Sequence, residues 1–252
     1  MRYCILKAGR ATRATRERIG DFDAMFLSLL SEPDQHWDVF DVEHGRFPPS
    51  LGDYAGVVIT GGPASATDDV PWVKELLNTV RACRDGAIPL LGICFGLQVV
   101  AQALGGQVAP NPEGWEIGLV ELEPIAAGAP PSPLTGANTA PLTGKAAPLR
   151  ILEVHQDIAS RLPPGAVPLA RSARTPFEAF TLGERILCLQ GHPEMDNDAV
   201  LELIGEREQR GLLPPLRAAE GRKSLENSPH RPFFRNWLKR FLREGRIPRS
   251  LF

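Results

Sequence analysis

Cysteine is scarce in this sequence, which has only Cys4, Cys83, Cys94 and Cys188 in 252 residues and no CxxC pair. A disulfide-stabilised protein would have a denser set, so free thiols in a reducing compartment are expected. Long apolar runs are also missing, since none approaches the roughly 18 residues of a membrane-spanning helix. The N-terminus reaches charged residues too early for the apolar stretch of a signal peptide. We therefore expect a cytoplasmic protein with no membrane partner.

Motifs for cofactors, metals and nucleic acids are absent as well. No Walker A or Rossmann glycine pattern occurs, so nucleotide binding has no supporting motif. His36, His44 and His230 lack the spacing of metal ligands. There is no basic platform interleaved with aromatic residues and no zinc-knuckle spacing. These observations predict no cofactor, no metal and no nucleic-acid partner.

The composition is that of an ordinary globular protein, with 43% hydrophobic and 23% charged residues and a net charge of −2. Wholesale disorder, a collagen repeat and a coiled coil are thereby excluded. Charge is uneven, because residues 205–252 contain 12 Lys and Arg against 5 Asp and Glu. That segment also has apolar residues at helical spacing, namely Phe233, Phe234, Trp237, Leu238, Phe241 and Leu242. It is predicted to be a helix that packs on its own domain and leaves a basic face in solvent.

Short apolar runs alternate with helical patterns through the first half of the chain. Strands are predicted at 3–6, 37–42, 57–60 and 88–91, and helices at 23–30, 72–83 and 97–104. This alternation predicts an α/β fold in which helices cover both faces of a parallel sheet.

The second half is less regular. Further strands are predicted at 118–122, 151–155, 167–170 and 186–190, and a helix at 198–209. Between them, residues 124–149 contain 6 Pro, 3 Gly and 7 Ala, which predicts a long surface loop. That loop is either a lid over a site or an inert insertion. No domain boundary is apparent, so we predict one domain over 1–252, with a core at 1–204 and a basic helical extension at 205–252.

The stretch from Gly92 to Gly96 reads Gly-Ile-Cys-Phe-Gly, the spacing of a nucleophile elbow with cysteine in place of serine. A sharp turn from strand to helix forces the nucleophile into a rarely allowed backbone conformation, and small flanking residues relieve the crowding. Cys94 is then placed just before a helix N-terminus, whose partial positive charge favours the thiolate. The backbone N–H of Phe95 points to the same place and is a candidate oxyanion donor. The alternative is a buried core cysteine.

A base and an acid of the kind that a nucleophilic cysteine needs occur in Gly191-His192-Pro193-Glu194, which follows a predicted strand. Pro193 keeps this stretch extended, so His192 and Glu194 project to the same side. Glu194 is thereby expected to orient the imidazole. Gly61-Gly62-Pro63 follows a third strand and offers the N–H of Gly62 as a second oxyanion donor. Because sites in parallel sheets gather at the carboxyl ends of strands, the three motifs are expected to meet.

Taken in this order, Gly-Gly-Pro, Gly-Ile-Cys-Phe-Gly-Leu-Gln and Gly-His-Pro-Glu resemble the motifs of a class I glutamine amidotransferase domain over roughly residues 1–204. The resemblance implies a three-layer, flavodoxin-like, open and mostly parallel sheet. It also implies a triad of Cys94 as nucleophile, His192 as general acid and base, and Glu194 as its partner, which cleaves a γ-amide through a γ-glutamyl thioester. Gln98 is implied to contact the glutamyl group, or else to pack the helix of the elbow.

By the same resemblance, the backbone of Val154-His155-Gln156-Asp157 holds the α-amino and carboxylate end of the substrate, so that His155 and Gln156 are expected substrate-binding residues. His155 is equally open to a purely structural role. No ammonia-accepting domain follows in the sequence, so the resemblance is greatest to stand-alone members, including the γ-glutamyl peptidases. The expected activity is hydrolysis of glutamine or of γ-glutamyl peptides. A glutaminase subunit with a separate synthetase partner is the alternative, and a non-catalytic binding protein is the third reading.

Overall fold

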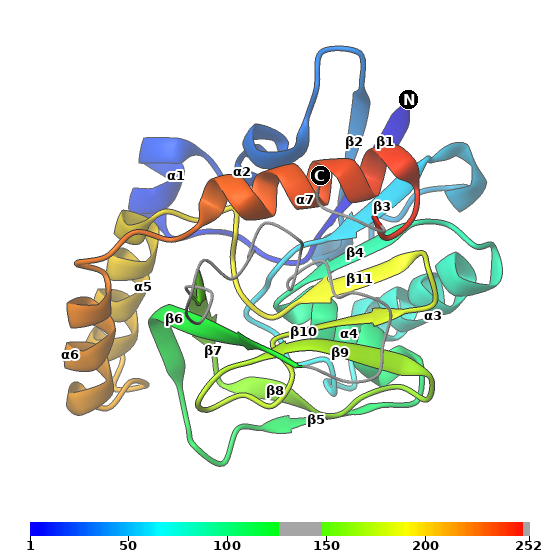
Figure 1. Cartoon of the computed structure of the whole chain (residues 1–252). Coiled ribbons are helices and arrows are strands. Elements are labelled where there is room, and N and C mark those ends of the chain that lie inside the picture. Colours follow the sequence, from blue (N-terminus) through cyan, green and yellow to red (C-terminus); the bar gives the residue numbers. More distant parts are fainter. Residues whose placement is uncertain (126–147, 249–252) are drawn as a thin grey trace, which may run out of the picture.

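Five parallel strands form the half of the molecule that carries the predicted motifs (Figure 1). The structure, a computed structural model, describes residues 1–125 and 148–248. The five strands, in spatial order, are β2 (His36–Asp41), β1 (Arg2–Lys7), β3 (Gly56–Ile59), β4 (Leu90–Ile93) and β11 (Ile186–Leu189). This order is that of the flavodoxin-like folds, so the predicted α/β fold class is confirmed.

Antiparallel strands extend the sheet beyond β11. They are β10 (Ala179–Leu182), β9 (Ala166–Arg171), β6 (Glu116–Pro124) and β7 (Leu149–His155), in that order. A separate two-stranded sheet pairs β5 (Gln107–Pro110) with β8 (Asp157–Arg161). The sheet is thus mixed, and its parallel half is the part that the β–α alternation predicted.

Helices cover both faces of the parallel strands, as Figure 1 shows. On one face lie α2 (Phe22–Leu30) and α7 (Arg231–Glu244), and on the other α3 (Pro71–Asp85) and α4 (Phe95–Ala103). Both faces are covered because successive side chains of a strand point to opposite faces of the sheet. Tyr3 and Ile5 of β1 are buried among residues of α2 and α7, whereas Cys4 and Leu6 are buried among residues of α3 and α4.

Three more helices gather at one end of the molecule (Figure 1): α1 (Arg13–Ile19), α5 (Asn197–Gln209) and α6 (Pro215–Ser224). Val200 and Ile204 of α5 pack with Leu152 and Val154 of β7 in a third apolar cluster. The N-terminal part of α1 is tied to α5, since the Thr12 hydroxyl donates to Glu202 at 3.1 Å. This end of the molecule adjoins the predicted site. Two 3₁₀ turns, Val42–His44 and Leu51–Asp53, complete the described elements.

Every strand and helix predicted from sequence is present, with shifted ends. No end differs by more than two residues, and β4, for example, begins two residues later than predicted and runs to Ile93, directly before the elbow. The predicted C-terminal helix is α7, and its apolar residues are buried or, for Phe233, partly buried. Of the predicted loop at 124–149, residues 126–147 lie outside the described residues, while Pro124 ends β6 and Leu149 begins β7. The sequence reading missed α1, α6, β5, β8 and β10.

All four cysteines are free thiols. Cys4, Cys83 and Cys188 are fully buried in the core, where burial raises the pKa of each thiol, that of Cys83 to about 12. These three are therefore core residues, as their apolar surroundings in the sequence predicted. Among the described residues, no helix is both long and apolar enough to cross a bilayer.

Candidate active site

Cys94 lies between β4 and α4 in a backbone conformation that non-glycine residues rarely adopt, with φ 52° and ψ −106°. Its N–H donates to the Leu189 carbonyl of β11 at 2.8 Å, and its carbonyl accepts from the Gln98 N–H of α4 at 3.1 Å. Both neighbouring elements thus hold the turn in place. The elbow predicted from sequence is present.

Close backbone contacts explain the glycines on either side of Cys94. A Cβ at Gly92 would lie 2.7 Å from the Gly96 carbonyl oxygen, and one at Gly96 would lie 2.5 Å from the Ile59 carbonyl oxygen of β3. Real Cβ atoms do not approach oxygen so closely, so any side chain would push α4 away from the sheet. These glycines keep the start of α4 close to the strands that carry the other two motifs.

His192 and Glu194 form a buried pair directly after β11. The Nδ1 of His192 lies 2.7 Å from the Oε1 of Glu194, and both side chains are almost fully buried. The His192 N–H donates to the Leu152 carbonyl of β7 at 2.7 Å, which fixes the backbone of the motif. Gly61 lies against both His192 and Cys94, since a Cβ at Gly61 would be 2.8 Å from His192 Cε1 and 3.6 Å from Cys94 Cβ. Folding therefore unites two motifs that are far apart in the sequence.

The charge state of His192 follows from these neighbours. Burial alone would lower the pKa of the imidazole, but the Glu194 carboxylate and the Cys94 side chain outweigh it and raise the pKa of His192 to about 10. An imidazole that is protonated at neutral pH can donate a proton to a leaving group. The arrangement suits nucleophilic chemistry by cysteine.

The two candidate oxyanion donors flank Cys94. Phe95 is the first residue of α4, so its N–H has no partner within the helix. Gly62 follows β3 and lines, together with Cys94, two cavities at this edge of the sheet. Both residues thus border Cys94, and their N–H groups remain candidates for stabilising a negatively charged oxygen.

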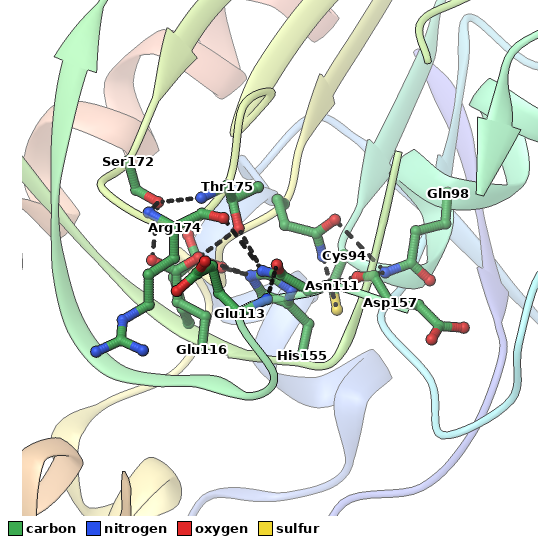
Figure 2. A network of polar contacts seen from close by, with 12 residues as sticks. Cys94, Gln98, Asn111, Glu113, Glu116, His155, Asp157, Ser172, Arg174 and Thr175 are labelled. Carbon is green, nitrogen blue, oxygen red and sulfur yellow. Dashed lines mark hydrogen bonds and ion pairs between the residues drawn. The ribbon is translucent and has the colours of Figure 1, made fainter. Parts of the chain in front are cut away.

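A glutamine that the sequence reading missed lies beside the sulfur. The Nε2 of Gln190 donates to Cys94 Sγ at 3.5 Å, and its Oε1 accepts from Gln98 Nε2 at 3.4 Å. Gln98 also donates to the Asp157 carbonyl at 2.8 Å, a link drawn in Figure 2. The predicted site residue Gln98 is therefore held by two neighbours. The only signal for Gln190 was its place at the end of a strand, two residues before His192.

His155 and Gln156, both predicted to hold substrate, have different surroundings. Gln156 is exposed and lines the smaller of the two cavities. His155 is buried, and its Nδ1 lies 3.2 Å from the Asp157 carbonyl. On its other side, Nε2 lies 3.5 Å from Glu116 and 3.4 Å from Glu153. His155 thus borders the cavity while its ring is engaged in a polar network, seen on the opposite side of Cys94 from Gln98 in Figure 2.

His155 lies in a buried cluster with three glutamates, Glu116, Glu153 and Glu178. We call these four residues the acid cluster. Burial and the neighbouring acids raise the pKa of Glu153 and of Glu178 well above the ordinary range. Burial acts the same way on Glu116, but hydrogen bonds from His155, Thr175 and Ser172 prevail and lower its pKa. One carboxylate is thus kept ionised beside two acids that favour the protonated form.

Two sets of side chains among the described residues bring three donor atoms within 4.8 Å, as a metal site would. They are Glu116, His155 and Glu178 in the acid cluster, and Asp41, Glu43 and His44 at the surface. In the first set, Ser172 and Thr175 already donate hydrogen bonds to Glu116. Nothing further in the described residues indicates a metal there.

Two cavities meet at Cys94. The smaller, of about 320 Å³, is lined by Gln98, His155, Gln156 and Asp157 among others. The larger, of about 740 Å³, is lined by residues of α1 and α5 and by His192. Both volumes are of the size that holds small ligands. Cys94 therefore borders both cavities.

Comparison with known proteins agrees with this geometry. The family model described as glutamine amidotransferase class-I matches residues 35–199. Gamma-glutamyl peptidase 4 of Arabidopsis thaliana is 31% identical over 245 residues, which are 96% of this chain and 95% of that protein. A glutamine-hydrolysing GMP synthase of Shewanella sp. (strain ANA-3) is 32% identical over 161 residues, 63% of this chain and 28% of that enzyme.

A solved structure shows the same fold. The crystal structure of a glutamine amidotransferase from Methylobacillus flagellatus superposes with a TM-score of 0.73 and 24% sequence identity. The similarity covers 98% of this chain and 94% of that one.

Proposed function

This chain belongs to the class-I glutamine amidotransferase family, and on that premise we propose that it hydrolyses the γ-glutamyl amide bond of glutamine or of γ-glutamyl peptides. The observation that carries the proposal is the buried Cys94–His192–Glu194 constellation, in which an elbow cysteine faces an imidazole held 2.7 Å from a carboxylate. Glutamine and γ-glutamyl peptides share the γ-glutamyl group, so one acyl site serves both.

In the first half-reaction, the Cys94 thiolate attacks the γ-carbonyl carbon. The negative charge that develops on the carbonyl oxygen is stabilised by the N–H groups of Gly62 and Phe95. The His192 imidazolium donates its proton to the amide nitrogen, the carbon–nitrogen bond breaks, and the free amine leaves. The product is a γ-glutamyl thioester on Cys94.

In the second half-reaction, His192 is neutral and takes a proton from water, whose oxygen attacks the thioester carbon. The carbon–sulfur bond breaks, glutamate is released and the thiolate is restored beside the imidazolium. Glu194 holds the ring by its Nδ1 throughout and stabilises its charged form. Each turnover thus consumes one water and yields glutamate and one amine.

The smaller cavity is the proposed site of the glutamyl group. Gln98 and Gln156 both line it and offer amide groups for an amino acid's α-amino and carboxylate ends. Gln98 is held by Asp157, so its amide is positioned before substrate binds. His155 also lines this cavity, and we propose that its buried ring supports the neighbouring Gln156 and Asp157.

A glutaminase subunit that passes ammonia to a separate synthetase is the second candidate. Its support is the 32% identity to a glutamine-hydrolysing GMP synthase. It differs from the first in predicting weak turnover of glutamine by the isolated chain and a rise when the partner is added. We propose the cytoplasm as the location in either case, because four scattered cysteines are too few for a disulfide-stabilised protein.

The test offers glutamine and glutathione to the purified chain and measures ammonia, glutamate and Cys-Gly by mass spectrometry. Cys94→Ala should lower hydrolysis about a thousandfold or more, because the nucleophile is lost. Cys83→Ala, which removes a core thiol of α3, is the matched control and should retain activity. A glutamine-derived diazo ketone should add to Cys94 alone among the four thiols.

Ammonia from glutamine without Cys-Gly from glutathione would favour the glutaminase reading. Hydrolysis of either substrate that survives Cys94→Ala would refute the proposed function. The proposed function would also be refuted if the diazo ketone failed to label Cys94 and neither substrate were hydrolysed. The remaining candidate would then be a binding protein.

A further inference from the structure

His192 shows on which side of the sulfur the leaving amine lies. His192 lines the larger cavity and not the smaller one, whereas Cys94 and Arg207 line both, at the boundary between the two cavities. A general acid must reach the nitrogen that departs, within about 3 Å. If the proposed function holds, the amine side of the substrate therefore occupies the larger cavity, while the glutamyl group occupies the smaller one.

The larger cavity is far bigger than ammonia needs. Its volume of about 740 Å³ lies in the range of small-molecule sites, about 300–1,000 Å³. Its walls contain five arginines from α1, from α5 and from the segments that follow β1 and α5, namely Arg10, Arg13, Arg16, Arg207 and Arg210. Among the described residues that line it, two are acidic, Glu202 and Glu206. The cavity is thus cationic.

Three of these arginines already have carboxylate partners. Arg10 lies 3.3 Å from Asp21, Arg13 lies 2.8 Å from Glu17, and Arg210 lies 3.1 Å from Glu206. The remaining acid of the cavity, Glu202, is also engaged, since it accepts from the hydroxyls of Thr12 and Thr15 and from Arg18. The charges of these three arginines and of Glu202 are therefore compensated by neighbouring groups. Two arginines of the cavity, Arg16 and Arg207, have no such ion pair among the described residues.

Arg16 and Arg207 are the two arginines of the larger cavity that form no ion pair with a described residue. Within residues 1–125 and 148–248, no carboxylate lies at ion-pair distance from either guanidinium. Arg16 donates only to the Ala11 carbonyl, at 2.6 Å, and Arg207 stands over the Trp115 ring with 5.2 Å between Cζ and the ring centroid. Both are half-buried. Burial lowers the pKa of Arg207 even though the charges of Glu206 and Cys94 act against it, so its charge is only partly compensated. A ligand anion would offset the cost of burying such a cation.

We infer that Arg16 and Arg207 form a leaving-group subsite that binds the carboxylate of an amino acid or peptide released from the γ-glutamyl group. The inference rests on the proposed function and narrows its substrate class. Arginine suits this role because its planar fork pairs with a carboxylate through two parallel hydrogen bonds. Free glutamine releases ammonia, which has no carboxylate and gains nothing from these contacts. The substrate class is therefore γ-glutamyl peptides with a free C-terminus.

Binding to the inactive Cys94→Ala protein tests this without any need for turnover. The probes are γ-glutamylalanine and γ-glutamyl-alanyl-glycine, each as the free acid and as the C-terminal amide, measured by calorimetry. For at least one pair, the acid should bind about tenfold more tightly than the amide. Adding Arg16→Gln and Arg207→Gln together should bring that ratio to about one. The matched control is Arg84→Gln, which removes an exposed arginine of α3 paired with Asp85 and should keep the ratio.

Equal affinities for acid and amide in both pairs would overturn the subsite. So would a preference for the acid that survives loss of both arginines. Hydrolysis by the protein with Cys94 intact is measured alongside. If the acid is preferred but no Cys94-dependent cleavage occurs, the subsite stands and the proposed function fails. If cleavage occurs without the preference, the subsite fails and the function stands.

Discussion

At the scale of single residues, His192 is held between Glu194 and Cys94, and its charge depends on both. Burial opposes the charged ring, while Glu194 first and Cys94 second raise its pKa to about 10. Glu194→Gln and Cys94→Ala should therefore each lower the pKa of His192. Titration of the imidazole nitrogens by NMR measures both shifts. A pKa that stays near 10 in both variants would contradict the pairing.

Glu178 illustrates a residue whose ionisation costs stability. Burial and Glu116 raise its pKa well above 4.5, so the folded protein holds a proton that the unfolded chain releases. The free energy of unfolding must then fall as pH rises from about 4.5 towards the folded pKa. Glu178→Gln removes this loss and should become increasingly stabilising, relative to the parent protein, as the pH is raised.

Urea denaturation of both proteins across that pH range measures the difference. Glu121→Gln, which changes an exposed glutamate of β6, is the control and should show no such trend. A stability difference for Glu178→Gln that is independent of pH would mean that the buried carboxyl is ionised in the folded protein.

At the scale of elements, the parallel half could be predicted because its apolar runs are local and alternate with helical patterns. The missed elements lack such a pattern. The sequence of α1, Arg-Ala-Thr-Arg-Glu-Arg-Ile, buries only Thr15 and depends on α5 for contacts. Likewise α6 buries only Ala218 and Gly221. Their existence is decided by neighbours distant in sequence.

The same limit applies to the site. Cys94, His192 and Glu194 are contained in short motifs and could be proposed from sequence. Gln190 and the pair of Arg16 and Arg207 could not, because only folding shows which side chains reach the sulfur and which arginines lack a carboxylate. The predicted end of β4 and the predicted start of α4 are each wrong by two residues, because the pairing of β4 with β11 continues to Ile93.

Close contact between α4 and β3 yields a prediction for two helical glycines. Gly96→Ala places a Cβ 2.5 Å from the Ile59 carbonyl oxygen, so α4 must shift. Overpacking of this kind should lower the free energy of unfolding by about 1–3 kcal/mol. Gly205→Ala, in α5 with open space around it, should instead raise it by about 0.5–1 kcal/mol. Equal effects of the two changes, measured in urea, would show that α4 is free to move.

At the scale of the whole molecule, α7 joins the end of the chain to its beginning. Trp237 is fully buried in the same apolar cluster as Tyr3 and Ile5 of β1, and the Tyr3 hydroxyl donates to the Leu242 carbonyl at 3.3 Å. The basic extension is thus packed on the sheet through its apolar face. We accordingly expect residues 1–252 to unfold as one domain, although its boundaries remain a prediction.

Removing the contact of α7 with the sheet should therefore weaken the whole fold and not one part of it. Trp237→Ala should cost about 3–5 kcal/mol, and tryptophan fluorescence and far-UV circular dichroism should still report one common transition. Trp237→Phe should cost much less, because it keeps most of the ring and removes an indole N–H that has no partner among the described residues. Two separate transitions in Trp237→Ala, with the later one unchanged from the parent protein, would instead mean that the basic extension is an independent unit. In that case the core at 1–204 would fold without it, and α7 would be free to serve another partner.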